Sequence, residues 1–566
     1  MRPLMTGVTL AVAMMAGAAH AQERESLEAL RQTTINLIEA LVQTGALTRE
    51  KADAIIDEAR RKAAAGAPAS GAAAASSPSD AQAAAKPVQR VPYISESVRA
   101  QIRNELKEEV IAQARQEKWG VPNAPSWTDR IRIEGDFRMR YQHERPDGDN
   151  TSPQAYYDAE AGDLGRISRA PDFAAYKLDS SGQPVASGST QDGRSRERIR
   201  LRLGLTAKVS DEVGVGVRLA TGNGTDRVST NQTLGQNFNK YQLFVDRAFV
   251  KLDPLEWLSV RAGRIPNPWF STDMIWSENL NFEGLASTAT WWSEDRAWGP
   301  FATVGWFPVS EQLQGLRARK TLAGVQVGSF MQLDERTKVK VGLAYYRYRN
   351  IEGREDTSYT ADGLGGFIAD PVGSGLHEYP VGLRQKGNTV FETQPGGDPA
   401  LAPVWGLAYR FAPVALTASA EFSHFSPYAL TLSGEYVYNT DFDAADFRRR
   451  AGSGFAGVDP GGKRDGYQLR MGFGWPEVDE FGKWQVNLTY RHLGSDAVLD
   501  AFTDSDLGLG GTNLKGYSLG VNYGLARNTS LGLRYLSAKS IDSTINETEP
   551  GSYGVNLMQV DFNVRF

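Results

Sequence analysis

Arginine occupies every second position from 194 to 202 in the stretch RSRERIRLRLGLTAKV, residues 194–209. On a helix these arginines would scatter around the cylinder and leave no apolar stripe. On a β-strand they share one face with Thr206 and Lys208, and the opposite face is apolar. That apolar face comprises Ile199, Leu201, Leu203, Leu205, Ala207 and Val209. The stretch therefore predicts a strand that separates an apolar medium from a second, strongly basic environment.

The N-terminus predicts export from the cytoplasm. Arg2 precedes an apolar run over residues 4–18, and the small residues Ala19 and Ala21 follow it. This pattern is typical of a secretory signal peptide over residues 1–21, cleaved after Ala21. A transmembrane anchor is the alternative, but the run is too short to cross a bilayer comfortably. No later stretch is long and apolar enough for a membrane helix, so the exported chain is either soluble or a transmembrane barrel.

Composition excludes several classes of function. The formal net charge of −5 argues against a nucleic-acid partner. The absence of cysteine excludes a disulfide scaffold, a thiolate metal site and a thiol nucleophile. The cluster Asp147-Gly148-Asp149-Asn150 has ligands for a cation, but a solvated acidic loop is the simpler interpretation. We therefore predict no metal and no cofactor.

Three segments precede the main body of the chain. Residues 22–62 have the apolar spacing of a helical hairpin or coiled coil, with Gly45 ending the first helix. They resemble short helical oligomerisation segments of the SHOCT-like type, although a solvated hairpin fits equally well. Residues 63–94 are a flexible Ala/Pro/Ser linker. Residues 95–118 predict another helix, which has three open roles: coiled-coil association, packing beneath a barrel, or entry into its lumen.

From Trp127 the apolar period changes to two, which predicts an all-β domain over residues 127–566. We predict sixteen strands, at 129–143, 194–209, 213–222, 241–253, 257–264, 282–291, 300–307, 321–333, 336–349, 403–423, 429–439, 464–475, 483–492, 515–525, 529–538 and 555–566. Weak patterns around 282–307 and 403–439 leave eighteen strands as an alternative. Short turns alternate with long loops, which is typical of a transmembrane antiparallel β-barrel with its short turns in the periplasm. The long loops are 144–193, 350–402, 441–463 and 539–554.

The last strand, VNLMQVDFNVRF, indicates which face meets lipid. It ends in Phe566 on the apolar face, which resembles the signal that the barrel-assembly machinery reads on outer-membrane proteins. A soluble β-sandwich also alternates apolar and polar residues. However, export, the terminal aromatic residue and the unequal connections favour a barrel. Because an arginine on the lipid face costs roughly 2–4 kcal/mol near the midplane, the arginines of 194–209 must face a wet lumen.

Two strands supply the predicted pore lining. Strand 129–143 directs alternate charged residues inward, and strand 194–209 lies beside it in a barrel. The candidate lining residues are Arg130, Arg132, Glu134, Asp136, Arg138, Arg140, Arg196, Arg198, Arg200 and Arg202. Such a wall predicts a pore that favours anions or dipolar solutes. Alternatively, Glu134, Asp136 and Asp561, which lies on the adjoining last strand, largely neutralise the arginines, which then form a structural network.

The loop 265–281 is the candidate constriction. It is aromatic and carries Asp273 and Glu278. Folded inward, it would narrow the pore and set acid against arginine. Folded outward, it would be a surface loop or a subunit contact.

The chain also resembles a known family, on the segments RVPYISESVRAQIRNELKEEVIAQARQEKW, WTDRIRIEGDFRMRY, RERIRLRLGL, RLATGNG, STNQTLGQNF, DRAFVKLDP and AGRIPNPWFSTDMIWSENLNFEGLA. These resemble the "putative porin" family of Gram-negative bacteria, in order, from about Arg90 to the C-terminus. The resemblance implies an outer-membrane β-barrel that passes small solutes. It implies no particular substrate and no catalytic residues.

The sequence thus predicts a porin in the Gram-negative outer membrane, with its N-terminal region in the periplasm. Its expected partners are outer-membrane lipid, the barrel-assembly machinery, small hydrophilic solutes and, in a homotrimer, further copies of itself. A structural anchor that reaches peptidoglycan through the N-terminal helices is the alternative function. An enzyme is not expected: His143 and His492 lie near the predicted rim, but no nucleophile motif accompanies them.

Overall fold

The computed structural model describes residues 130–161, 167–174, 176–178, 180, 184–186, 189–311, 319–356, 359–361, 367–369, 375–394 and 403–566. The predicted signal peptide, helical hairpin, linker and helix 95–118 lie outside these residues. Every predicted strand falls within them, apart from the first residue of the strand 129–143.

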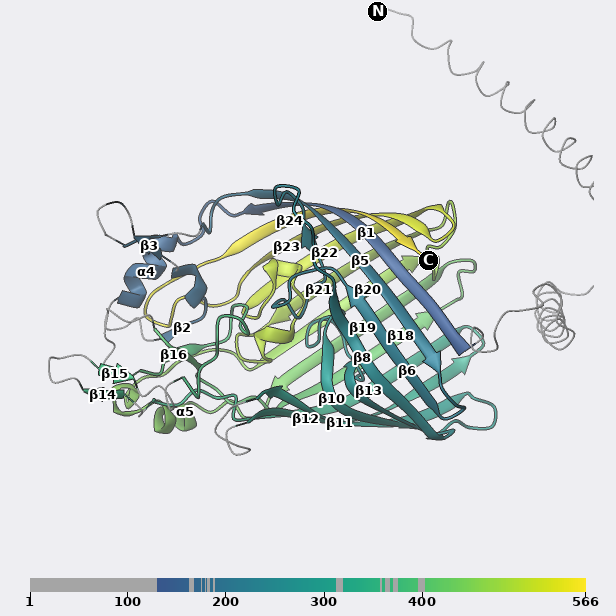
Figure 1. Ribbon diagram of the computed structural model, residues 1–566, viewed down its shortest axis with the longest axis horizontal. Coiled ribbons are helices and arrows are strands. Elements are labelled where there is room, and N and C mark those ends of the chain that lie inside the picture. The colour runs from purple at the N-terminus through teal and green to yellow at the C-terminus, as the bar shows by residue number, and fades with distance from the viewer. Residues whose placement is uncertain are drawn as a thin grey trace, which may run out of the picture. The chain divides into compact units, whose positions relative to one another are not determined.

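The described strands form a closed antiparallel β-barrel (Figure 1). The main sheet has seventeen strands, and without β7, which is a two-residue pairing inside a loop, sixteen remain. They are β1 Ile131–Pro146, β5 Arg194–Lys208, β6 Val213–Ala220, β8 Phe244–Leu255, β9 Leu258–Pro266, β10 Asn281–Thr290, β11 Trp298–Ser310, β12 Lys320–Asp334, β13 Thr337–Arg349, β18 Pro413–Phe422, β19 Ala429–Asn439, β20 Asp465–Gly474, β21 Trp484–Leu493, β22 Leu514–Ala526, β23 Thr529–Ser540 and β24 Gly554–Arg565. The barrel closes where β1 pairs with β24, with Asp136 opposite Arg565.

The prediction of sixteen strands is confirmed, and the alternative of eighteen is wrong. One strand was predicted too long. The range 403–423 contains β17 Trp405–Leu407, which pairs with β16 Val390–Glu392 in a loop, and only β18 enters the barrel. The apolar pattern continues through both because β17 is also buried, so periodicity does not distinguish them. The short turns lie at one end of the barrel and the long loops at the other (Figure 1).

The outward face of the wall is apolar. On β1, Ile133 and Met139 are 65% and 48% exposed, whereas the intervening Arg140 is 1% exposed. Exposed aromatic residues gather toward both ends of the strands. They are Tyr141, Tyr345, Tyr436, Tyr467, Tyr490, Tyr517 and Tyr535 toward the long loops, and Trp257, Trp291, Trp292, Trp298, Phe425 and Tyr523 toward the short turns. Two aromatic girdles around an apolar band are the pattern that a bilayer selects on a barrel.

Helices are short and belong to the long loops. The described helices are α4 Pro153–Ala161, α5 Ala444–Arg450 and the 3-10 helices η2 Pro171–Ala174, η3 Ser453–Phe455, η4 Asp500–Phe502 and η5 Leu507–Leu509. The loops also contain the short strands β2 Ile167–Ser168, β3 Tyr176–Leu178, β4 Pro184–Ala186, β7 Gln232–Thr233, β14 Tyr359–Ala361 and β15 Phe367–Ala369. A helix of sufficient length and hydropathy to cross a bilayer is absent from the described residues.

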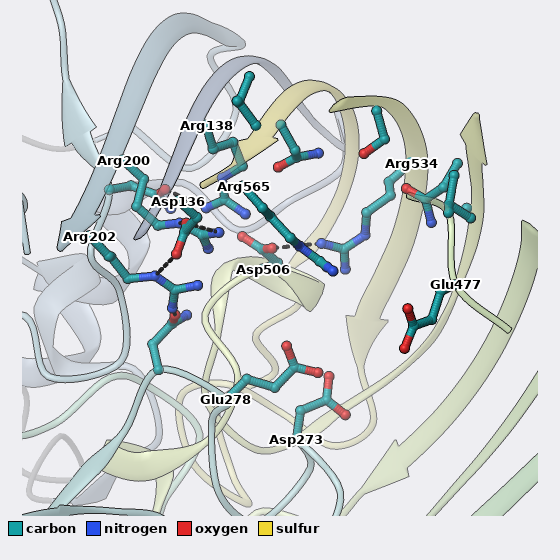
Figure 2. Close-up of a pocket in the computed structure, with 18 of the residues that line it drawn as sticks. Asp136, Arg138, Arg200, Arg202, Asp273, Glu278, Glu477, Asp506, Arg534 and Arg565 are labelled. Atoms are coloured by element: carbon teal, nitrogen blue, oxygen red, sulfur yellow. Dashed lines mark hydrogen bonds and ion pairs between the residues drawn. The ribbon is translucent and has the colours of Figure 1, made fainter. Parts of the chain in front are cut away.

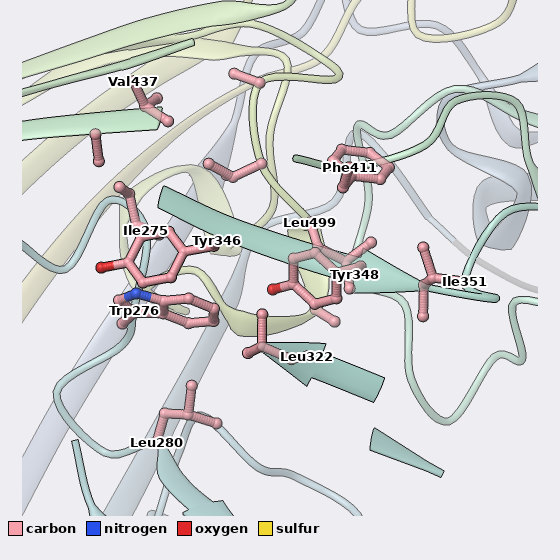
Figure 3. Close-up of a cluster of buried hydrophobic side chains, with 14 of the residues drawn as sticks. Ile275, Trp276, Leu280, Leu322, Tyr346, Tyr348, Ile351, Phe411, Val437 and Leu499 are labelled. Carbon is pink, nitrogen blue, oxygen red and sulfur yellow. The ribbon is translucent and has the colours of Figure 1, made fainter. Parts of the chain in front are cut away.

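A hydrophobic core fills one side of the lumen. The loops 267–280 and 494–513 meet the inner faces of β10–β13, β18 and β19 there (Figure 3). Trp276, 2% exposed, packs edge-on against Phe282 and Tyr346 at ring-centroid distances of 5.0 and 5.2 Å. Leu322 and Leu499 belong to the same cluster. The space that remains open therefore lies against the opposite wall, which includes β1 and β5.

Candidate pore and its charged lining

An open cavity of about 1030 Å³ lies inside the barrel. Its wall is formed by β1, β5, β6, β8 and β20–β24, together with parts of the loops 221–243, 267–280 and 494–513 (Figure 2). Nine arginines and seven acidic side chains line it, and no lysine does. They are Arg132, Arg138, Arg200, Arg202, Arg218, Arg247, Arg470, Arg534, Arg565, Glu134, Asp136, Asp273, Glu278, Glu477, Asp504 and Asp506. The space is polar, and arginine supplies all its basic side chains.

The register of β1 and β5 gathers the arginines of the two strands. Arg138 lies opposite Arg200, and Arg140 opposite Arg198. Because side chains alternate along a strand, all four point to the same face of the sheet. Asp136 neutralises the next part of the wall, where its carboxylate accepts from Arg200 Nε at 2.9 Å and Arg202 Nε at 2.6 Å.

Arg140 belongs to a buried ion-pair network and does not line the cavity. Its Nε and Nη2 donate to the two carboxylate oxygens of Asp561 at 2.6 and 2.8 Å. Its Nη1 lies 3.1 Å from both oxygens of Asp506, which also accepts from Arg534 at 2.9 Å. Two arginines thus converge on one loop carboxylate, and the network ties β1, β23 and β24 to the loop 494–513.

The remaining predicted lining residues differ in their surroundings. Arg196 forms an ion pair with Glu144. Arg132 lies 3.7 Å from Glu134, and both are largely exposed. Arg130 is exposed and precedes β1. The neutralised-network interpretation therefore holds for part of the wall, although Glu144 and Asp506 were not among the acids predicted to neutralise it.

The loop 267–280 folds into the barrel, as in the inward alternative, and three contacts hold it there. The Phe270 backbone N–H and C=O bond the Gln326 side chain at 2.8 and 2.7 Å. The Thr272 hydroxyl donates to Glu435 at 2.5 Å. Asp273 accepts from Gln468 at 2.7 Å and pairs with two arginines.

Asp273 faces a different wall from the one predicted. Its oxygens lie 3.1 Å from Arg470 on β20 and 3.1 Å from Arg491 on β21, so its partners are not the arginines of β1 and β5. Glu278 has an exposed side chain that lines the cavity, 4.0 Å from Arg470. Asp273 is therefore a fixed ion-pair partner, and Glu278 is the acid of this loop that remains open to the cavity (Figure 2).

Asp504 and Asp506, in the loop 494–513, are acidic residues that sequence reasoning missed. Burial alone would raise the pKa of Asp506, but Arg140 and Arg534 hold that pKa well below its usual range. Burial and the neighbouring carboxylates of Asp506 and Asp273 raise the pKa of Asp504 to about 6. Asp506 therefore stays ionised, whereas Asp504 gains a proton under mildly acidic conditions.

This difference predicts a pH-dependent charge in the cavity. As the pH falls from about 7.5 to about 5, through the raised pKa of Asp504, the cavity loses one negative charge. Anion preference in a planar bilayer should therefore increase over that range. The Asp504→Asn variant should have a high anion preference at both pH values, because the substitution removes most of the pH dependence. An unchanged pH dependence in Asp504→Asn would contradict this assignment.

The two rim histidines lie on the outward face. His143 Nδ1 lies 2.8 Å from Ser195 Oγ, and His492 stacks on Tyr467 at 5.5 Å. In the loop after β1, the Asn150 amide is bonded to the backbone oxygens of Thr190 and Gly554, so it holds the loop together. Within the ranges that the structure describes, no group of three or more His, Asp or Glu side chains is arranged to hold a metal ion.

The terminal Phe566 completes barrel closure. Its backbone N–H donates to Gly135 O at 3.0 Å, and its C=O accepts from Gly135 N at 2.7 Å. Its side chain is 60% exposed and lies over Gly135, where an added Cβ would meet the ring at 2.5 Å. An exposed terminal ring is accessible to a partner, and its role as an assembly signal remains a prediction.

Comparisons with known proteins place the chain in a family. A family model described as "Putative porin" matches residues 31–566. No curated protein sequence matches at a significant level. Structures similar to this one include the outer membrane channel DcaP of Acinetobacter baumannii, with 11% identity over 77% of this chain and 97% of that one and a TM-score of 0.38. OprB of Pseudomonas putida has 8% identity over 78% of this chain and 95% of that one, with a TM-score of 0.40.

The family match covers most of the chain, including all sixteen strands and the loops that line the cavity. It agrees with the resemblance seen in the sequence, and it favours a channel over an enzyme. The chain belongs to the "Putative porin" family.

Proposed function

We propose that this chain is an outer-membrane pore for passive diffusion of small hydrophilic solutes, with a preference for anions. The observation that carries this proposal is the position of the open space. The hydrophobic core fills the lumen beside β10–β13, β18 and β19, so a solute must pass beside the arginines of β1 and β5. A positive wall raises the local concentration of anions and lowers that of cations.

The charge balance supports the sign of the selectivity. The cavity lining has nine arginines against seven acidic side chains. Asp273 and Asp506 are held in ion pairs that take up Arg470 and Arg534 of the lining, which leaves seven arginines against five acidic side chains. The net field along the passage is therefore positive.

Neutralising two wall arginines tests this proposal. Arg200→Gln with Arg202→Gln removes two positive charges and leaves Asp136 without its partners. The anion-to-cation permeability ratio, from reversal potentials in a KCl gradient, should fall about threefold or more, because one kT of local potential changes ion concentrations by about that factor. Adding Asp136→Asn should recover part of the loss. A ratio that does not change in the double variant would contradict the arginine-based preference.

Location and assembly follow from the same proposal. The apolar outer face with its aromatic girdles suits outer-membrane lipid, and the exposed Phe566 suits recognition by the barrel-assembly machinery. We further propose a homotrimer, to which the N-terminal segment 22–62 contributes. Deleting residues 22–90 should then lower the sedimentation size of the purified protein. An unchanged size would argue against that contribution.

A further inference from the structure

We propose that Arg138 and Arg198 form a binding site for a small oxyanion, the carboxylate or phosphate group of a permeating solute. This inference rests on the proposed pore function and deepens it. A pore with a basic wall need only repel cations, whereas this site would hold an anion briefly and saturably. The evidence is the position of these two arginines and the partners that each has.

The two arginines stand where two cavities meet. Arg138 lines the cavity of about 1030 Å³, and Arg198 lines a second cavity of about 490 Å³ next to the loop 221–243. Asn231, in that loop, lines both cavities. A solute that moves from one cavity to the other passes this asparagine and the two guanidinium groups.

The neighbouring carboxylates are already engaged by other arginines. Asp136 accepts from Arg200 and Arg202. Asp561 accepts two hydrogen bonds from Arg140 and lies 3.9 Å from Arg138, beyond hydrogen-bonding distance. Because Asp136 and Asp561 are paired with these other arginines, they do not neutralise Arg138 and Arg198, and the wall stays positive there.

Arg138 and Arg198 instead bond neutral amides. Arg138 Nη2 donates to Asn231 Oδ1, and Arg198 Nη1 donates to Gln142 Oε1 at 3.4 Å. Across the described part of the chain, the buried Nε of each has no hydrogen-bond partner, and Arg198 has no carboxylate within 4.0 Å. Asp226 lines the smaller cavity with Arg198, and its carboxylate accepts from the Val228 backbone N–H.

The chemistry of this pair suits an oxyanion. A guanidinium presents a planar fork of donors that matches a carboxylate or phosphate group. Charge-assisted hydrogen bonds are roughly twice as strong as neutral ones, so an anionic oxygen competes well with the Asn231 amide oxygen on Arg138. The amide oxygen marks the position where a solute oxygen would dock. Arg138 and Arg198 are diagonal neighbours on the paired strands β1 and β5, and an anion bound to them would offset their like charges.

Concentration-dependent current block tests the site. Full-length protein is inserted in planar bilayers in KCl, and inorganic phosphate or, in a separate arm, acetate is added. Single-channel current should fall with added anion and reach a plateau. In Arg138→Gln with Arg198→Gln, the half-blocking concentration should rise about tenfold or more, since several charge-assisted hydrogen bonds are lost. Arg138→Lys with Arg198→Lys keeps the charge and removes the fork. Its half-blocking concentration should lie between those of the unchanged protein and the glutamine variant.

Arg261→Gln is the matched control, because Arg261 lines a separate cavity of about 970 Å³. It removes one positive charge, against two in the double variant, and should leave the half-blocking concentration unchanged. Equal effects of Arg261→Gln and the double variant would overturn the site and indicate a general charge effect. The site would also be refuted if the channels are open and prefer anions but neither phosphate nor acetate blocks them. That result would still agree with the proposed pore function. Folded protein that forms no channels would instead refute the proposed function.

Discussion

Asp506→Asn is expected to destabilise the folded barrel by about 3–5 kcal/mol, because removing one partner from a buried ion pair leaves the other charge uncompensated. Asp506 receives Arg140 Nη1 at 3.1 Å and Arg534 Nη1 at 2.9 Å, and the Arg140 side chain is 1% exposed. The neutral amide cannot balance two guanidinium groups. The free energy of unfolding in urea, followed by tryptophan fluorescence in lipid vesicles, measures the loss.

The same substitution should strengthen anion preference, since it removes a negative charge from the cavity and leaves Arg534, which lines the cavity, without its ion-pair partner. Glu477→Gln is the control, because Glu477 lines the same cavity with an exposed side chain. It should change stability by less than about 0.5 kcal/mol, as surface substitutions usually do. Equal losses of stability in the two variants would show that Asp506 does not hold the network together.

Trp276→Ala is expected to cost about 3–5 kcal/mol and to loosen the loop 267–280 inside the lumen. Trp276 is 2% exposed and packs between Phe282 and Tyr346, so its removal opens a cavity in the core that fills one side of the barrel. A loop that is no longer fixed should raise the mean single-channel conductance and its fluctuation. Both quantities come from the same bilayer recordings, and unfolding in urea gives the stability.

Two comparisons separate packing from aromatic content. Trp276→Phe keeps a ring in the core and should lose less stability than Trp276→Ala. Trp292→Ala removes a tryptophan that is 50% exposed on the outer face, so its effect on conductance should be small. A Trp276→Ala protein with unchanged conductance and stability would mean that the loop is held without this core.

The sequence predicted the barrel wall well because strand periodicity is local. Alternation along residues 194–209 placed Arg198, Arg200 and Arg202 on the inner face, and the structure puts them there opposite Arg140, Arg138 and Asp136. The strand 403–423 was overextended because β17 is buried in a loop sheet and continues the apolar pattern. Periodicity reports burial, and it does not tell the barrel core from the loop core.

The charge partners across the lumen were harder to predict because they depend on how the loops fold. Asp506 is 366 residues from Arg140 in sequence, and nothing in its local segment distinguishes it from a surface acid. Glu144 and Asp561 are different, because they continue the inward alternation of β1 and β24. Asp561 was found on that basis, and the same alternation extended by two residues beyond Gln142 would have found Glu144. Asn231 has no such pattern, because it lies in a loop.

The proposed function depends on an open passage beside an arginine wall. The most direct test is the reversal potential of single channels formed by purified full-length protein in a planar bilayer with a KCl gradient. We expect discrete ion-permeable channels whose reversal potential has the same sign as the equilibrium potential of chloride. The absence of channels in folded protein, or a reversal potential on the potassium side, would contradict it.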